Sequence, residues 1–245
     1  MPKKATSSKR ILPFAIILLV LLVAGGAAWA MWRGAQERPQ TNSAAKSSAN
    51  GVGASSTASS SSSPAITGAT PPHAKGDERA PVTLEEFADL QCPSCAVTHK
   101  DLQKILGEYG PQRVRLIFRH YPLVQLHRNA LAAAVATEAA ARQNKFWEMQ
   151  DQLYRNQKAW SEEADPRQIF YDYARTLGLN ADRFMQDMRD PLGLQRVKAD
   201  TARGNALGIT GTPTLYLNGR QLTVSEATEN GLRVALDAAL RTAGK

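Results

Sequence analysis

Cysteine is scarce in this chain: 245 residues contain two, and both lie in one short motif, Cys92-Pro93-Ser94-Cys95. Two thiols cannot form a framework of several structural disulfides. They also supply at most half of a closed zinc site, which needs four Cys or His ligands. A single pair of cysteines with this spacing favours redox chemistry, in which the two thiols form and break a disulfide with each other.

Surplus positive charge is also scarce in the part of the chain that can fold. The formal net charge is +8, but the first ten residues carry four positive charges and no negative one. After position 72 the chain has 23 basic and 21 acidic residues, so this part is nearly neutral. A basic groove is not indicated, and we expect no nucleic-acid partner.

Charge is absent from Ile11 to Trp32, a 22-residue stretch that follows the basic start. At about 1.5 Å per residue, a helix of this length can cross a bilayer core of about 30 Å. The basic flank should stay in the cytoplasm. We therefore expect residues 1–32 to form a cytoplasmic tail and a single-pass signal-anchor in the inner (cytoplasmic) membrane, with a periplasmic domain. Secretion after signal cleavage near Ala30 is the alternative.

Large apolar residues are nearly missing from residues 33–73, where Ser, Ala, Gly, Thr and Pro dominate. Such a segment cannot bury enough apolar surface to offset the entropy of ordering. We expect a disordered tether with a reach of about 35 Å. It would join the anchor to a folded domain over residues 74–245.

The folded part has the pattern of an α/β domain. Alternation predicts strands, helical periodicity predicts helices, and Asn218-Gly219 predicts a hairpin turn. The predicted elements are a strand over Pro81–Leu90, a helix from Pro93 to about Glu108, a strand over Val114–Phe118, an all-helical insertion at about 124–208 with a helix capped by Asn180 and a last helix over about Leu194–Ala206, strands over Thr214–Leu217 and Arg220–Thr223, and a helix from Ser225 to about Arg241. The predicted fold class is an α/β sheet with helices on its faces.

The predicted position of Cys92 favours its thiolate. The residue lies at or just before the first turn of a helix, where unpaired N–H groups and the helix dipole stabilise an anion. The thiolate is the form that attacks disulfides. Cys95 lies one turn further in and suits the resolving step. After a buried strand and at a helix start, this motif indicates a thioredoxin-like redox site.

Two more residues point to the same site. Pro213 begins a predicted strand and is a candidate for a cis-proline. Glu86 shares a strand face with Val82 and Leu84, so its carboxyl group should be buried, have a raised pKa, and exchange a proton with Cys95. In the alternative interpretation, Glu85 is exposed and Glu86 is an ion-paired structural acid.

Five segments resemble the DsbA-like thiol-disulfide oxidoreductases, especially their membrane-tethered members: Val82–Phe87, Gln91–Cys95, Phe118–Leu123, Lys145–Met149 and Gly211–Thr214. The resemblance covers about residues 75–240 and implies a thioredoxin fold with a helical insertion. It implies that Cys92 is the nucleophile and Cys95 the resolving thiol. Pro213 would be the adjacent cis-proline and Glu86 the buried strand carboxylate. Thr212, with Pro93 and Ser94, would contact the client chain.

Ser94 departs from the strongly oxidising members of this family, which carry histidine at that position. Without that cation, we expect a Cys92 pKa below the usual value of about 8.5 but above that of the most oxidising relatives. The pair should then be more reducing than theirs. The direction of electron flow therefore stays open.

The other polar and aromatic candidates have mainly structural interpretations. His99 is expected to be packed or hydrogen-bonded, although it could tune the cysteines or join them at a metal. No acidic or thiol cluster accompanies His120 or His127 in the sequence, so no metal site is predicted. Arg119 is expected to be a solvated or capping charge. The aromatic residues expected to form the insertion core, with a client groove as the alternative, are Phe146, Trp147, Tyr154 and Trp160.

The predicted function is an extracytoplasmic thiol-disulfide oxidoreductase that introduces disulfides into exported proteins with free thiols. The resemblance implies reoxidation by a quinone-linked membrane oxidase of the DsbB-like or vitamin K epoxide reductase-like kind. We expect a monomer that needs no cofactor. The alternatives are a membrane-tethered reductase or isomerase, and a non-catalytic thioredoxin-fold binding module.

Overall fold

The computed structural model of the protein describes residues 66–244. The expected anchor over Ile11–Trp32 lies outside the described residues, as does the expected tether up to residue 65. Among the residues that are described, no helix is both long enough and apolar enough to cross a membrane.

A five-stranded mixed sheet with strand order β1-β3-β2-β4-β5 forms the centre of the domain. The central pair, β2 and β3, runs parallel, while the other pairs are antiparallel. Both central strands become fully buried toward their C-terminal ends, as expected for strands covered on both faces. The strands are β1 His73–Lys75, β2 Val82–Ala88, β3 Val114–His120, β4 Thr214–Leu217 and β5 Arg220–Gln221.

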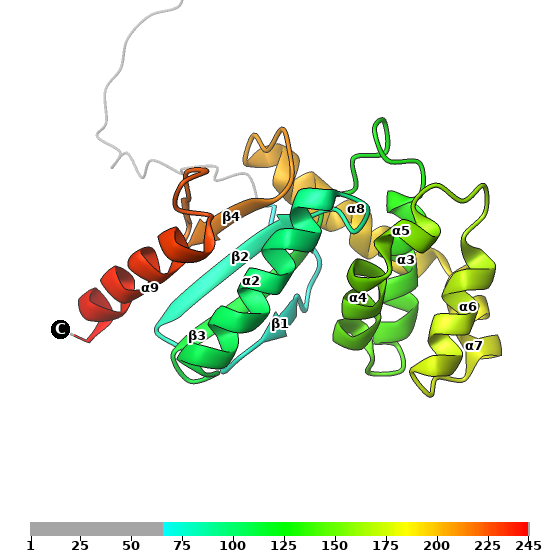
Figure 1. Ribbon diagram of the computed structural model, residues 1–245, viewed down its shortest axis with the longest axis horizontal. Helices are drawn as coiled ribbons and strands as arrows, with labels where there is room; N and C mark the ends of the chain where they lie inside the picture. Colours follow the sequence, from blue (N-terminus) through cyan, green and yellow to red (C-terminus); the bar gives the residue numbers. More distant parts are fainter. Residues whose placement is uncertain (1–65, 245) are drawn as a thin grey trace, which may run out of the picture. The chain divides into compact units, whose positions relative to one another are not determined.

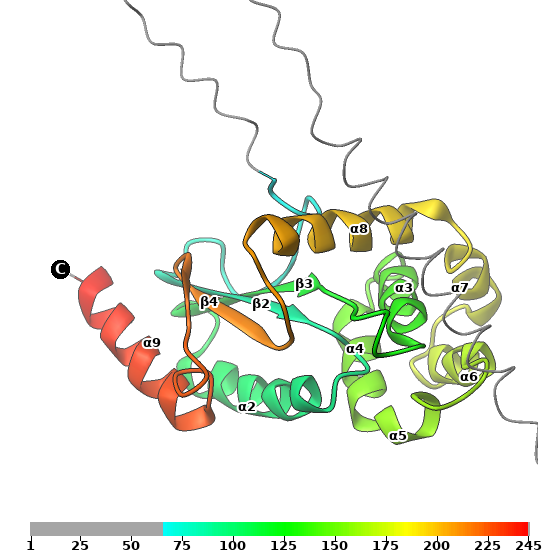
Figure 2. The same cartoon turned by 90° about the horizontal axis from the view of Figure 1, so that it is seen from above.

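Helices cover both faces of the sheet (Figure 2). On one face lie α2 (Pro93–Tyr109) and α9 (Glu229–Ala243), and on the other lies α8 (Pro191–Ala206). The apolar core between the sheet, α2 and α9 includes Leu84, Ile105 and Leu236, each of which is fully buried. Burial of side chains of this size stabilises the packing by about 2 kcal/mol each. This core fixes the direction of α2, whose first turn carries the cysteine pair.

The helical insertion lies beside one end of the sheet, between β3 and α8 in the chain (Figure 1). Its own core is built around large aromatic residues, among them Trp160, Phe170 and Phe184, and this core extends to both cysteines. The redox pair at the start of α2 therefore packs into the core of the insertion. The helices of the insertion are α3 Ala130–Ala141, α4 Phe146–Arg155, α5 Gln157–Trp160, α6 Arg167–Thr176 and α7 Ala181–Asp187.

Most predicted elements are present with bounds that differ by one or two residues at an end, and larger differences occur at three places. Strand β1 was not predicted, because three residues are too few to show a period. The last helix begins at Glu229 rather than at Ser225, because the Thr228 hydroxyl caps it by accepting the Gly231 N–H at 3.2 Å. Helix α8 begins at Pro191, before the expected Leu194. The hairpin turn is as predicted, with both Asn218 (φ 48°) and Gly219 (φ 82°) in the left-handed region.

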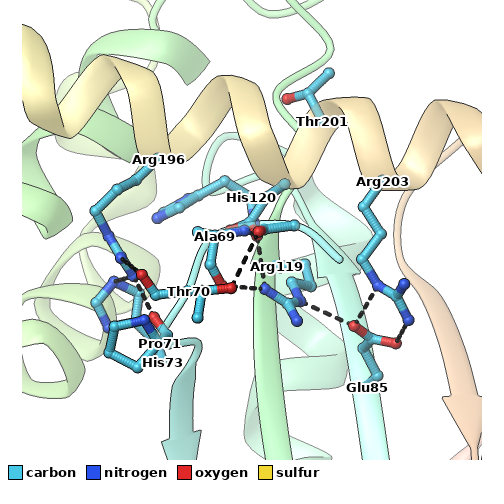
Figure 3. Close-up of polar contacts among 12 residues, drawn as sticks. Ala69, Thr70, Pro71, His73, Glu85, Arg119, His120, Arg196, Thr201 and Arg203 are labelled. Atoms are coloured by element: carbon cyan, nitrogen blue, oxygen red, sulfur yellow. Dashed lines mark hydrogen bonds and ion pairs between the residues drawn. The ribbon is translucent and has the colours of Figure 1, made fainter. Parts of the chain in front are cut away.

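The prediction for Arg119 is wrong, because its guanidinium is buried in an ion-pair cluster (Figure 3). Its Nε lies 2.8 Å from Glu85 Oε1, and its Nη1 lies 2.9 Å from Asp200 Oδ1. Arg203 donates to both Glu85 oxygens, at 2.9 and 2.8 Å. Alternation along β3 places the Arg119 side chain beneath α8. Two carboxylates compensate the cost of removing its charge from water.

The same cluster binds residues 66–73, which were expected to belong to the tether. Arg119 Nη1 donates to the Ala69 carbonyl at 2.8 Å, and Arg196 Nη2 donates to the Pro71 carbonyl at 2.8 Å (Figure 3). Gly68 permits this close approach, since a Cβ there would lie 2.8 Å from Arg119 Nη1 and the residue has φ +81°. The folded domain therefore includes this segment.

Candidate active site

Cys92 occupies the turn between β2 and α2, at the N-cap of the helix. Its N–H donates to the Asp89 carbonyl at 3.1 Å, and its own carbonyl accepts the Ala96 N–H at 3.2 Å. Pro93 fills the first helical position, where an N–H is not needed. Cys92 is 6% exposed and Cys95 is fully buried, and both are free thiols. Only the first cysteine is open to a reaction partner.

Two groups approach the Cys92 sulfur from different elements. The Ser94 hydroxyl lies 3.4 Å from Cys92 Sγ, and the Thr212 carbonyl accepts from the thiol at 3.4 Å. The peptide bond that follows Thr212 is cis, as predicted for Pro213. The fold therefore brings together two segments that are 120 residues apart in the chain.

The two thiols have opposite acid–base character. Hydrogen bonding from Cys95, assisted by the Ser94 hydroxyl, outweighs burial and lowers the pKa of Cys92 to about 4. Burial, followed by the hydrogen bond with Cys92, raises the pKa of Cys95 far above its usual range. At neutral pH the site therefore holds a thiolate at Cys92 and a protonated thiol at Cys95.

Glu86 is the buried acid of this site. Its side chain comes from the middle strand β2, is 2% exposed, and has one carboxyl oxygen, Oε1, with no hydrogen-bond partner among the described residues. Burial raises its pKa to about 8, as predicted, and its charge raises the pKa of Cys95 further. The alternative interpretation is wrong, because Glu85 rather than Glu86 is the ion-paired acid.

Two residues of the insertion complete the support of the cysteine turn. The Tyr154 hydroxyl donates to the Asp89 carbonyl at 3.5 Å, and burial raises its pKa well above 10. Gln157 Nε2 donates to the carbonyls of Leu90 and Cys92, at 2.8 and 3.1 Å. The sequence indicated Tyr154 only as a core aromatic and did not indicate Gln157, because more than sixty residues separate these contacts in the chain.

The core prediction for the insertion aromatics is confirmed for Phe146, Tyr154 and Trp160, which are all buried. Trp147 is half-buried and packs beneath the Lys75 ammonium, 5.1 Å from its ring centre. His99 is buried, with Nε2 3.2 Å from Asp151 Oδ1, which agrees with the packed interpretation.

Acidic groups do accompany the other histidines, contrary to the sequence interpretation. His127 contacts Asp89, and both His73 and His120 contact Glu138 through Nε2, at 2.9 and 3.3 Å. The ligand atoms of this second group lie within 4.8 Å of one another, so they could hold a metal ion. Arg196 Nε, however, lies 2.8 Å from Glu138 Oε2. Its positive charge opposes a cation there, and the group serves to join β1, β3, α3 and α8.

Comparison with known proteins gives one family and a recurring fold. A family model described as "Thioredoxin" matches residues 69–238. The chain is 38% identical over 149 residues to the Na(+)/H(+) antiporter NhaA 3 of Salinispora tropica. The matched region covers 61% of this chain but 22% of the antiporter. The chain thus spans less than a quarter of that relative's length.

Solved structures that share the fold of the described domain include the following two. Oxidised BdbD from Bacillus subtilis has a TM-score of 0.62 at 21% identity and covers 69% of this chain and 93% of its own. DsbA2 from Pseudomonas aeruginosa has a TM-score of 0.53 at 27% identity and covers 67% of this chain and 92% of its own.

Proposed function

Because the chain belongs to the thioredoxin family and is a DsbA-like thiol-disulfide oxidoreductase, we propose that it introduces disulfides into exported proteins through its Cys-Pro-Ser-Cys motif. The observation that carries this proposal is the environment of the Cys92 sulfur. The sulfur is accessible, lies at a helix start, and receives hydrogen bonding from Cys95 and Ser94. These contacts stabilise the reduced thiolate, and a stabilised reduced form makes the disulfide a stronger oxidant.

The reaction begins with the Cys92–Cys95 disulfide. A client thiolate attacks Cys92 Sγ, the exposed sulfur, so that a client–Cys92 disulfide forms and the Cys92–Cys95 bond breaks. Cys95 leaves as a thiolate. A second client thiolate then attacks the client sulfur, which forms the client disulfide and releases Cys92 as a thiolate. Two electrons pass from the client to the enzyme, and the low pKa of Cys92 makes it a good leaving group.

Glu86 supplies the proton that Cys95 needs when it leaves. A thiolate at the buried Cys95 is strongly disfavoured, as the raised pKa of this thiol shows. The Glu86 carboxyl group has a pKa of about 8 and is therefore mostly protonated at neutral pH. It gives a proton to Cys95 during client oxidation and takes one back when the enzyme is reoxidised.

The client chain is held beside the cis-proline. Pro93 and Ser94 are exposed next to Cys92, and Thr212 and Pro213 are partly exposed. The Thr212 hydroxyl is buried and has no hydrogen-bond partner in the described part of the chain, so it can serve the client or the thiolate. These positions form the contact surface proposed for the client.

The working place proposed for the domain is the outer side of the cytoplasmic membrane. The antiporter relative supports this proposal, because its name describes a membrane protein and part of its chain is similar to this domain. In this chain, the uncharged stretch over Ile11–Trp32 would provide the anchor. Clients would be exported proteins, and a quinone-linked membrane oxidase, DsbB-like or vitamin K epoxide reductase-like, would restore the disulfide.

A reductase is the second candidate, because Ser94 leaves the thiolate without a neighbouring cation. The reduction potential of the purified domain, measured by equilibration with glutathione, separates the two. A potential of about −120 mV supports an oxidant, and one of about −270 mV contradicts the oxidase proposal.

A further inference from the structure

Asp89 is a buried acid that the redox mechanism does not use. Its side chain is fully buried at the end of β2, three residues before Cys92. Its Oδ1 accepts the Gln91 N–H at 2.7 Å, and its Oδ2 accepts the Leu123 N–H at 2.8 Å. The second contact of Oδ2 is His127 Nδ1, at 2.7 Å.

His127 is the one ion-pair partner of Asp89 within residues 66–244. A buried carboxylate is costly unless its oxygens are hydrogen-bonded and its charge is compensated. The two N–H groups and the imidazole together supply the hydrogen bonds of this carboxylate. If the imidazole is removed, Oδ2 loses a charge-assisted bond, which is the stronger kind of hydrogen bond.

The contacts of Asp89 join the cysteine turn to a second loop. Residues 89–92 form the turn that carries the nucleophile, and residues 121–129 form the loop after β3. A further bond, from the Asn129 N–H to Gln91 Oε1 at 2.8 Å, ties the same two segments. The position of Cys92 relative to Ser94 and Thr212 therefore depends on a loop about thirty residues away in the chain.

We propose that Asp89 and His127 form a positioning pair that holds the cysteine turn in the geometry in which the Cys92 sulfur is hydrogen-bonded. The two side chains bond to no sulfur of the redox pair and act through the turn, while the backbone of Asp89 is hydrogen-bonded to Cys95. This role rests on the dithiol chemistry of the family and is independent of whether electrons flow toward or away from clients.

Two physical effects predict opposite results when Asp89 is replaced. Removal of a negative charge near a thiolate stabilises that thiolate and makes the pair more oxidising. Loosening of the turn removes hydrogen bonds from the thiolate and makes the pair more reducing. The positioning role requires the second effect to prevail.

The test measures the equilibrium constant of the reduced and oxidised domain with glutathione at pH 7. For His127→Ala we expect a change of about tenfold toward the more reducing side, which corresponds to about 30 mV. His127→Asn keeps an N–H donor close to the Nδ1 position and should restore most of the change. Asp89→Asn keeps the shape but cannot accept both Oδ2 bonds, and it should also become more reducing.

His73→Ala is the matched control. His73 has a similar exposure, 15% against 20%, and a similar bond to a buried carboxylate, 2.9 against 2.7 Å, but its carboxylate is Glu138. We expect a lower melting temperature and an unchanged equilibrium constant. The proposal is overturned if His127→Ala lowers only the melting temperature, if His73→Ala shifts the constant equally, or if Asp89→Asn becomes more oxidising. Should His127→Ala not fold, Asp89→Asn and His127→Asn decide. Because only differences between variants are read, the oxidase proposal can fail while this one stands.

Discussion

Replacement of Glu86 by Gln should make the protein more stable, and increasingly so as the pH rises. The folded protein holds this carboxyl group at a pKa of about 8, against a usual value of 4.5, because the group is buried. Between these values the folded state binds a proton that the unfolded state has lost. The stability that the protonated Glu86 contributes is therefore fully present below about pH 4.5, decreases as the pH rises above that value, and is lost once the pH has risen through about 8.

The size of the loss follows from that interval. At about 1.4 kcal/mol per pH unit, the raised pKa of Glu86 lowers the free energy of unfolding by about 3 kcal/mol at pH 7 and by nearly 5 kcal/mol above pH 8, relative to its value below pH 4.5. The amide of Gln does not titrate in this range. Glu86→Gln should therefore match the wild type near pH 4 and exceed it by several kcal/mol at pH 8.5.

Urea unfolding of the oxidised protein at pH 4, 7 and 8.5 measures this difference directly. Glu85→Gln, one position along β2, is the matched control. Burial raises the pKa of Glu85, but bonds from Arg203 and Arg119 outweigh it and leave that pKa lowered. Its replacement should therefore destabilise the protein above pH 4.5. A difference between Glu86→Gln and wild type that does not change with pH would refute the assignment of a buried, protonated carboxyl group.

Three other predictions follow from the same structure. Cys95→Ala should accumulate mixed disulfides between Cys92 and exported proteins on non-reducing gels, and their absence would refute the nucleophile assignment, while Cys92→Ala should form none. Ser94→His should move the reduction potential toward more oxidising values, since it places a cation beside the thiolate, and an unchanged potential in the glutathione assay would count against that electrostatic reasoning. Gly68→Ala should cost about 2 kcal/mol in urea unfolding, because its φ is +81° and a Cβ would meet Arg119, whereas Gly107→Ala, which meets nothing within 4 Å in helix α2, should be neutral or stabilising. Equal effects of the two alanines would contradict the close approach at Gly68.

Local features of the sequence were sufficient for the redox motif and its immediate setting. A Cys-x-x-Cys pair with Pro93 after the first cysteine can be assigned to a helix start from capping rules alone. The burial of Glu86 follows from the period of two along β2, and the hairpin follows from Asn218-Gly219. Each of these depends on interactions among residues that are close in the chain.

The tertiary structure decided which partners these residues meet. The charge of Arg119 predicted exposure, but the fold brings Glu85 and Asp200 to it and makes burial favourable. The sequence shows no acidic cluster beside His127, but in the fold the turn after β2 places Asp89 in contact with it. The cysteine pair itself, and the helix that starts at it, were determined by the sequence. The hydrogen bond of the Cys92 thiol to the distant Thr212 carbonyl and the support of its turn by Tyr154 and Gln157 exist only once packing has joined the sheet and the insertion.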